Sequence, residues 1–363
     1  MVILSDYLIP FLLVLTVLVF VHEFGHYIVA RLVGVHVEVF SIGFGPEIVG
    51  RTDRVGTRWK FSAIPLGGYV KMLGDANMAS QPDSDAPFTA AEKARAFPFK
   101  RLDQRTSVVA AGPISNFLFA IIALAIVFAV HGQPFTPPVV GSVQPDSAAA
   151  AAGFQAGDRI ESINGGPVAR FEDVQRVVRR HPGESLRIEV RRDDGTTMLS
   201  ATPNRRTVTD RFGNQHTIGL LGVTRSGVSY RRLGPVAALS TGASETAAVA
   251  GATLQAIGEI VLGQRSADQL GGPVKIAEMS GEVAESGWYD FVWFLAVLSI
   301  NLGLINLFPV PMLDGGHLLF YAIEAVRGRP LGQRAQEYGF RLGFALVVTL
   351  LLLVTWKDLL QIT

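Results

Sequence analysis

Two histidines and a glutamate lie close together inside a long apolar stretch near the start of the chain. His22, Glu23 and His26 fit the pattern H-E-x-x-H. On an α-helix, side chains four positions apart share a face, so both imidazoles can bind one metal ion while Glu23 reaches the water bound to it. Zinc is the expected ion, because it accepts two nitrogen ligands and a carboxylate and leaves a fourth position for water. The spacing predicts a hydrolytic zinc site.

An alternative interpretation is that these three residues are ordinary polar positions of a helix. Average residue frequencies give a chance H-E-x-x-H in roughly one of a hundred chains of this length. The chance is lower inside an apolar span, which disfavours all three residue types. The cluster therefore favours a metal site.

Two histidines need a third ligand, and the chain has no cysteine to supply it. Any metal must then be held by histidine, aspartate or glutamate. Asp314 is the candidate, because it follows a broken apolar span in which Pro309 and Pro311 can turn its carboxylate back towards a neighbouring helix. Asp314 could instead cap a helix that begins at Gly315. His317 is expected to support the site, since two histidines and one acid already fill it.

Composition indicates that these residues lie in a membrane. Hydrophobic residues make up 49% of the 363 residues and charged residues 17%, with a mean hydropathy of +0.33. That balance is too apolar for an ordinary soluble protein of this size. The net charge of +1 and the lack of a nucleic-acid-binding motif argue against a nucleic-acid partner.

Four apolar segments are long enough to cross a hydrocarbon core of about 30 Å as helices. They comprise residues 7–33, 107–130, 291–307 and 340–356. The first opens at Asp6 and shows no cleavage site, which indicates a retained anchor. Basic residues follow the first and third segments, namely Arg31, Lys100, Arg101, Arg105, Arg327, Arg329 and Arg334. By the positive-inside rule both loops face the cytoplasm, so both chain ends and the insert from residue 132 to 289 lie outside.

Residues 138–203 of the insert are expected to form a compact β-rich domain. Its expected elements are strands at 139–143, 160–164 and 186–190, a helix at 171–180, and a last strand from 197 after a turn at 194–195. This order, with the sequences Gly-Asp-Arg-Ile and Asn-Gly, resembles a PDZ domain of the circularly permuted bacterial kind. Its groove could bind a peptide C-terminus as an added strand, or the domain could be a spacer with an empty groove.

Other segments flank the predicted spans. Residues 35–44 and 58–73 predict strands, which can lie beside a membrane helix if their backbone pairs internally or lines a wet cavity. Residues 81–96 predict a flexible linker. Residues 235–262 could be a fifth span, but two glutamates there would be costly in lipid, so we expect an external amphipathic helix.

The two metal motifs and the insert together resemble the bacterial site-2 protease family, zinc intramembrane proteases of peptidase family M50. The resemblance rests on residues 22–26 and 306–317 (NLFPVPMLDGGH) and runs over nearly the whole chain. It implies one zinc ion per chain, with three ligands and one general base: His22, His26, Asp314 and Glu23.

The resemblance also implies how substrate is held. The glycine-rich hairpins would form a membrane-associated sheet whose edge binds an unwound substrate segment, since the carbonyls of an intact helix are shielded. The expected substrate-binding residues are Asn301, Asn306, Gly43, Gly45, Gly67, Gly68 and Tyr69. Family members act second, in the bacterial inner membrane, on single-span proteins such as anti-sigma factors of envelope stress signalling and on remnant signal peptides. Enterobacterial members carry two tandem PDZ domains, whereas this chain shows one that resembles the second.

The predicted fold is therefore a polytopic α-helical membrane protein with four transmembrane helices, membrane-associated β-hairpins and an inserted PDZ domain. The predicted segments are 1–34 (first transmembrane helix), 35–104 (cytoplasmic-side hairpins and linker), 105–131 (second transmembrane helix), 132–205 (extracytoplasmic PDZ domain), 206–288 (extracytoplasmic connecting region with amphipathic helix) and 289–363 (third and fourth transmembrane helices with the Leu-Asp-Gly motif). Two other functions stay open. A zinc or proton transporter also places ionisable residues in the membrane, although no inverted repeat is visible. A PDZ membrane scaffold would leave Glu23 without a role.

Overall fold

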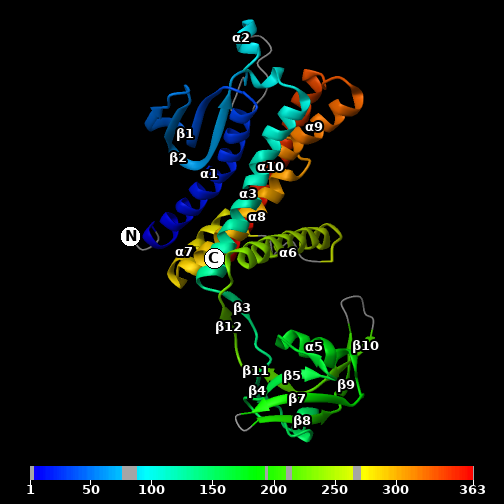
Figure 1. The fold of residues 1–363 in the computed structure, drawn as a ribbon. Helices are drawn as coiled ribbons and strands as arrows, with labels where there is room; N and C mark the ends of the chain where they lie inside the picture. The colour runs from blue at the N-terminus through cyan, green and yellow to red at the C-terminus, as the bar shows by residue number, and fades with distance from the viewer. Residues whose placement is uncertain (1–3, 76–87, 193–194, 210–214, 265–270, 363) are drawn as a thin grey trace. The chain divides into compact units, whose positions relative to one another are not determined.

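The computed structural model describes residues 4–75, 88–192, 195–209, 215–264 and 271–362. They form two compact units, drawn in Figure 1. The first unit combines Met1–Val127 with Gly234–Thr363, and the second is Phe128–Leu233. Part of the predicted linker (81–87) and Asp194 of the predicted turn lie outside the described residues.

Four helices of the described chain are long and apolar enough to cross a membrane. They are α1 (Ile9–Leu32, preceded by a short π-helix), α3 (Leu102–Val130), α8 (Trp288–Leu307) and α10 (Gln333–Ile362). Each predicted apolar segment overlaps one of these helices over most of its length, and α3 and α10 extend beyond the predicted bounds. Continuous apolar sequence thus located the spans, whereas their polar ends could not be seen from hydropathy.

The sheet of the first unit is built from two long antiparallel strands, β1 (Val37–Thr52) and β2 (Arg58–Met72). Both strands bend near the middle, where Gly43 and Gly67 have φ of 88° and 118°. Such positive φ angles favour glycine, which lacks the Cβ that would clash. Because of the bends, Phe40 pairs with Val70 on one side and with Trp59 on the other. The strand structure predicted between 58 and 73 is therefore one bent strand, β2.

Side chains from the sheet pack onto α1. Val37, Phe40 and Val70 are buried with Ala30 of α1 and Val108 of α3 in one hydrophobic cluster. This cluster fixes the second half of β2 beside the face of α1 that carries the histidines.

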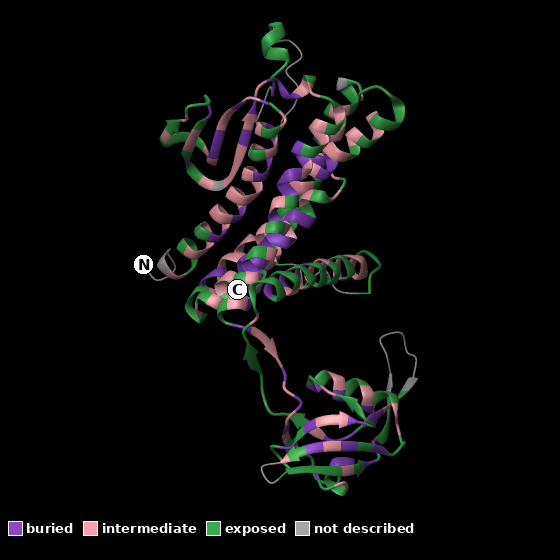
Figure 2. Cartoon of the chain, in the orientation of Figure 1, coloured by how far each residue is buried: buried purple, intermediate pink, exposed green. Residues whose placement is uncertain are grey.

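Shorter helices complete the first unit. These are α2 (Ala90–Lys93), α6 (Pro235–Val261), α7 (Pro273–Ser286) and α9 (Asp314–Arg327). Figure 2 shows α6 largely exposed. One turn of it lies against α3, where a Cβ on Gly242 would be 2.7 Å from the carbonyl oxygen of Ile121. The predicted helix at 235–262 is thus present and touches a candidate span, while its placement outside the membrane stays a prediction.

The second unit is a small β-rich body with one helix packed on it. A four-stranded sheet has the order β6 (Gly166–Pro167), β5 (Arg159–Ile163), β7 (Leu186–Arg192), β8 (Gly195–Ala201). Helix α5 (Phe171–Arg180) has the predicted bounds and buries Val174 and Val178 against the core of this sheet. A short helix, α4 (Ala148–Ala151), lies earlier in the unit.

This unit extends beyond the predicted end at residue 205. The later strands pair with early ones: β11 (Val223–Arg225) with β4 (Val140–Val143), and β12 (Ser229–Arg231) with β3 (Gln133–Phe135). A further hairpin joins β9 (Asn204–Thr209) to β10 (Gln215–Leu220). These pairings join residues some 80 to 100 positions apart, so they cannot be recognised in a short window of sequence. The prediction therefore placed β11 and β12 in the connecting region.

Candidate active site

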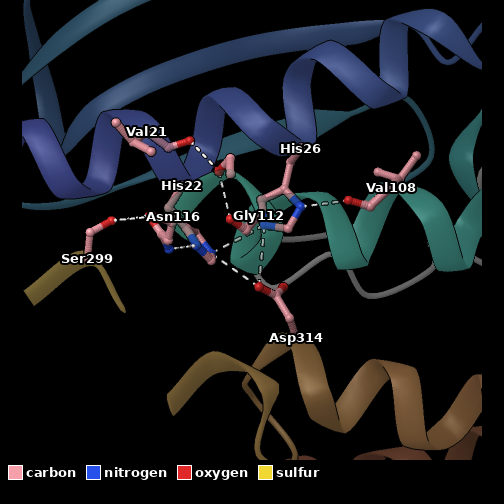
Figure 3. A network of polar contacts seen from close by, with 9 residues as sticks. Val21, His22, His26, Val108, Gly112, Asn116, Ser299 and Asp314 are labelled. Carbon is pink, nitrogen blue, oxygen red and sulfur yellow. Dashed lines mark hydrogen bonds and ion pairs between the residues drawn. The ribbon is translucent and has the colours of Figure 1, made fainter. Parts of the chain in front are cut away.

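The three predicted metal ligands come together in the first unit. His22 and His26 project from α1, and Asp314 projects from the first turn of α9, as Figure 3 shows. Asp314 Oδ2 lies 3.1 Å from His22 Nε2 and 3.5 Å from His26 Nε2, and the two Nε2 atoms are 3.3 Å apart. All three side chains are at most 16% exposed.

These distances fit a tetrahedral zinc ion. With zinc bonds of about 2.0–2.1 Å, two ligand atoms of a tetrahedron lie about 3.3–3.4 Å apart. The three measured separations fall on both sides of that value. His, His and Asp also leave one position for water, as catalytic zinc sites do.

The hydrogen bonds around the site also call for a cation. His26 Nδ1 lies 2.9 Å from the carbonyl oxygen of Val108, which can only accept, so Nδ1 carries the proton and neutral His26 presents a lone pair at Nε2. In the neutral imidazole that lone pair faces Asp314 Oδ2, which is buried and accepts no hydrogen bond from the described residues. Lone pairs that face each other without a hydrogen repel, and a cation between them removes the conflict.

Asn116 of α3 positions the other histidine, and it was not predicted from the sequence. Its side-chain amide lies 2.9 Å from His22 Nδ1, and Ser299 of α8 donates to its backbone carbonyl at 2.9 Å. If His22 Nε2 binds a metal, Nδ1 carries the proton, so the amide must present Oδ1 to it; the two amide ends are assigned from such networks. Asn116 is fully buried. The signal available was an asparagine inside an apolar span, where polar residues usually have a purpose.

Gly112 of α3 provides the space for the imidazoles. A Cβ there would overlap Nε2 of His26 and lie 2.9 Å from Cε1 of His22. No sequence pattern within α3 indicates this role of Gly112, because the contact joins helices about 90 residues apart in the chain.

A tight loop before α9 sets the orientation of the Asp314 side chain. The Val310 carbonyl accepts from Leu313 N at 3.0 Å, and Met312 has a φ of 88°. A Cβ on Gly315 would overlap the carbonyl oxygens of residues 307 and 308, so α9 starts pressed against the chain that precedes it. The cap position is Leu313 and no side chain caps the helix, so the alternative of Asp314 as a simple N-cap is wrong.

Glu23 lines the same cavity as the three ligands. The cavity has a volume of 310 Å³, and Gly68, Tyr69 and Val70 of β2 line it together with Glu23. Of the predicted substrate-binding residues, Asn306, Gly67, Gly68 and Tyr69 line this cavity. His317 also lines it, as a supporting residue would.

Three predicted substrate-binding residues lie elsewhere. Asn301 accepts a hydrogen bond from Thr253 of α6 at 3.0 Å and lines a separate apolar cavity. Gly43 and Gly45 lie at the bend of β1 and do not line the cavity, although Phe44 between them does, so their contact with substrate stays a prediction.

Comparison with known proteins identifies the family. The profile of peptidase family M50 matches residues 10–350. The chain belongs to peptidase family M50. A protein of Agrobacterium fabrum, named as a proposed zinc metalloprotease, is 47% identical over 362 residues, covering 98% of this chain and 96% of its own. The regulator of sigma-E protease RseP of Escherichia coli is 32% identical over 450 aligned positions, covering 96% of this chain and 97% of its own.

The M50 chain is therefore a zinc metalloendopeptidase and a multi-pass membrane protein. This favours hydrolysis over the transporter and scaffold alternatives. The alignment with RseP is longer than the 363 residues of this chain, so RseP has segments without a counterpart here. A solved PDZ domain of an SdrC-like protein from Listeria monocytogenes covers 25% of this chain, and 88% of its own, at 21% identity and a TM-score of 0.20. That similarity carries no argument, so the PDZ assignment stays a prediction.

Proposed function

We propose that this site-2 protease cleaves the transmembrane segments of single-span membrane proteins, using one zinc ion held by His22, His26 and Asp314. The observation that supports this most is the meeting of these three side chains on helices α1 and α9, in a cavity flanked by candidate membrane spans. When bound, zinc supplies Lewis-acid activation of water and of the peptide carbonyl.

Glu23 is the proposed general base. Its carboxylate lies in the wall of the ligand cavity, where it can take a proton from water and pass it to the leaving amine. The low exposure of the ligands limits bulk water at the site.

An apolar cavity next to the site suits a hydrophobic substrate. It has a volume of 460 Å³ between α1, α7 and α8, and it shares Val19, Gly67 and Leu302 with the catalytic cavity. A segment of a membrane helix could lie there at little cost in desolvation. Asn301, which lines this cavity, is better placed near such a segment than at the scissile bond.

The second half of β2 is proposed to bind the unwound part of the substrate. Residues 68–72 pair with β1 along one edge only, and Gly68 and Tyr69 line the catalytic cavity on the other side. An extended peptide could add to that edge, and the Asn306 amide in the same cavity could satisfy exposed backbone groups.

The setting of the reaction follows from the same proposal. The protein lies in the bacterial inner membrane with both termini and the second unit outside, as the basic loops indicate. Its substrates are proteins already trimmed by another protease, of the anti-sigma factor type, and remnant signal peptides. The similarity to RseP, named as a regulator of sigma-E protease, supports a role in regulated intramembrane proteolysis and envelope stress signalling. A cavity of 100 Å³ between α5 and the chain before β11 is where a peptide C-terminus would bind in the predicted PDZ groove.

The direct test is Glu23→Gln in purified, reconstituted enzyme with a single-span substrate. We expect a loss of cleavage of about 10²–10⁴-fold with zinc content unchanged, because only the proton acceptor is removed. Glu172→Gln, at an exposed position on α5, is the matched control and should cleave as wild type. Comparing membrane proteomes of cells with wild-type and Glu23→Gln enzyme would then list the natural substrates. Unchanged turnover in Glu23→Gln would remove this residue from the role of base.

A further inference from the structure

A cavity in the second unit is rimmed by arginines and lies away from the predicted PDZ groove. It has a volume of 440 Å³ and lies between the β3–β12 ribbon and the segment from β5 to the start of α5. Its lining combines three arginines with three apolar side chains: Arg159, Arg170, Arg231, Phe135, Val168 and Leu233. The arginines are exposed and the three apolar side chains are half-buried.

Three of the carboxylates near the cavity are already engaged with other arginines. Within the described part of this unit, Asp158 pairs with Arg192 at 2.6 Å, Glu161 with Arg191 at 2.7 Å, and Asp173 with Arg176 at 3.0 Å. The cavity itself is lined by no acid, and none of its three arginines has an ion-pair partner among the described residues. Three positive charges around an apolar floor are therefore left for an anion that is not part of this chain.

Chain connectivity puts this cavity near the surface of the bilayer. Helix α3 has 29 residues and is about 44 Å long, which exceeds a hydrocarbon core of about 30 Å. Gln133, in the cavity wall, follows the end of α3 at Val130 by three residues, a reach of at most about 11 Å. Leu233, which follows β12, donates its backbone N–H to the carbonyl oxygen of Phe128 in the last turn of α3 at 3.1 Å. The end of β12 therefore also lies close to the end of α3.

The ribbon also has the composition of a membrane interface. Tyr230 of β12 is 51% exposed and its ring lies 4.7 Å from that of His131. Tyrosine is enriched at the level of lipid headgroups, where its ring meets apolar material and its hydroxyl meets water.

We propose that this cavity binds the phosphate headgroup of an anionic phospholipid. Guanidinium groups donate paired hydrogen bonds to phosphate oxygens, and three of them supply more donors than one headgroup phosphate can use. The apolar floor of Phe135, Val168 and Leu233 would take the glycerol and the first methylenes of the lipid, which free phosphate does not have. A lipid held here fastens the base of the second unit to the headgroup layer.

The test measures lipid binding to the full chain purified in detergent, by native mass spectrometry with added phosphatidylglycerol or phosphatidylcholine. Replacing Arg159, Arg170 and Arg231 with glutamine should weaken phosphatidylglycerol binding about 100-fold, since each basic residue at an anionic surface is worth about fivefold. Binding of phosphatidylcholine should change little. The matched control replaces three other exposed arginines of the same unit with glutamine and should bind as wild type: Arg180, Arg187 and Arg206.

Two results would overturn the proposal. One is equal loss of phosphatidylglycerol binding in the cavity variant and the control variant, which would show a general charge effect. The other is complete displacement of the lipid by inorganic phosphate at equal concentration, which would assign the cavity to small anions. If the glutamine variant does not fold, the triple lysine variant replaces it. It keeps the charge, so its affinity for phosphatidylglycerol should stay within about tenfold of the wild-type affinity. Loss of all selectivity for phosphatidylglycerol over phosphatidylcholine in this variant would contradict the site.

Discussion

Each unit of the molecule buries a carboxylate, and the two carboxylates have different partners. In the second unit, Asp158 is 1% exposed and accepts hydrogen bonds from Arg192 at 2.6 and 3.0 Å and from the backbone of Gln155 at 2.8 Å. In the first unit, Asp314 Oδ2 is buried and accepts none from the described residues, although two imidazole nitrogens face it.

The difference separates a structural acid from a functional one. Burying a carboxylate is costly unless it is paired, so Asp158 with its partners stabilises the fold. Asp314 Oδ2 lacks such hydrogen-bond donors among the described residues, which supports the proposed role of Asp314 as a metal ligand. The hydrogen-bond partners of the two buried carboxylate oxygens distinguish these residues.

Among the substitutions that test this comparison, the largest loss of activity is expected at Gly112. In Gly112→Ala the new Cβ would overlap His26 Nε2, so the imidazole must move and proteolysis should fall by about 100-fold or more. Zinc content measured by elemental analysis should fall with it. The matched control is Gly251→Ala in α6, where a Cβ meets nothing within 4 Å, and activity should be kept. An active, zinc-replete Gly112→Ala enzyme would show that α3 does not confine the site.

A smaller effect is expected at Asn116, which touches a proposed ligand rather than the ion. Asn116→Ala removes the partner of His22 Nδ1 and should weaken zinc affinity about 10–100-fold, as measured by competition with a chelator. Excess zinc should restore most of the cleavage, because the proposed base, Glu23, is untouched. If affinity is unchanged, the hydrogen bond does not orient His22.

In the second unit the corresponding change should affect stability alone. Asp158→Ala removes hydrogen bonds to Arg192 and should destabilise this unit by about 1–3 kcal/mol. Hydrogen exchange of β5 and β7 in the full chain measures this, with Glu184→Ala as an exposed control. Zinc content and cleavage of a short substrate should stay at the wild-type level. A loss of zinc in Asp158→Ala would contradict the separation of the two roles.

The smallest effect is the pH dependence of the same residue. Burial alone would raise the pKa of Asp158, but the hydrogen bonds from Arg192 and Gln155 outweigh it and hold the pKa below its usual value of about 3.8. The folded pKa is depressed, so this stabilisation is present above the unfolded pKa and is lost as pH falls through the folded one. Protection of β5 should therefore decrease below about pH 4 in wild type and change less in Asp158→Asn. Equal pH dependence in both would exclude Asp158 as the cause.

The sequence predicted the four long apolar helices and the three side chains that meet at the proposed metal site for clear physical reasons. Hydropathy marks a membrane helix directly, and the spacing of His22 and His26 fixes their common face on α1. The loop before Asp314 could be expected to turn because two prolines precede it. These features are local, so each can be read from a short window of residues.

What the sequence did not reveal depends on contacts between distant segments. Gly112 and Asn116 matter only because α3 lies against α1, and nothing in either helix states that pairing. The predicted end of the second unit at residue 205 was too early, because β11 and β12 pair with β4 and β3 near the start of the unit. The resemblance to the family placed Asn301 and Asn306 together as substrate-binding residues, whereas in the structure Asn301 accepts a hydrogen bond from Thr253 of α6.

The central claim is that His22, His26 and Asp314 hold one zinc ion between them. X-ray absorption at the zinc edge of purified enzyme, with elemental analysis of the same sample, tests it most directly. The account predicts one zinc per chain with two imidazole nitrogens and oxygen ligands at about 2.0–2.2 Å, and loss of the metal in Asp314→Ala. Wild-type zinc content and an unchanged spectrum in Asp314→Ala would contradict it.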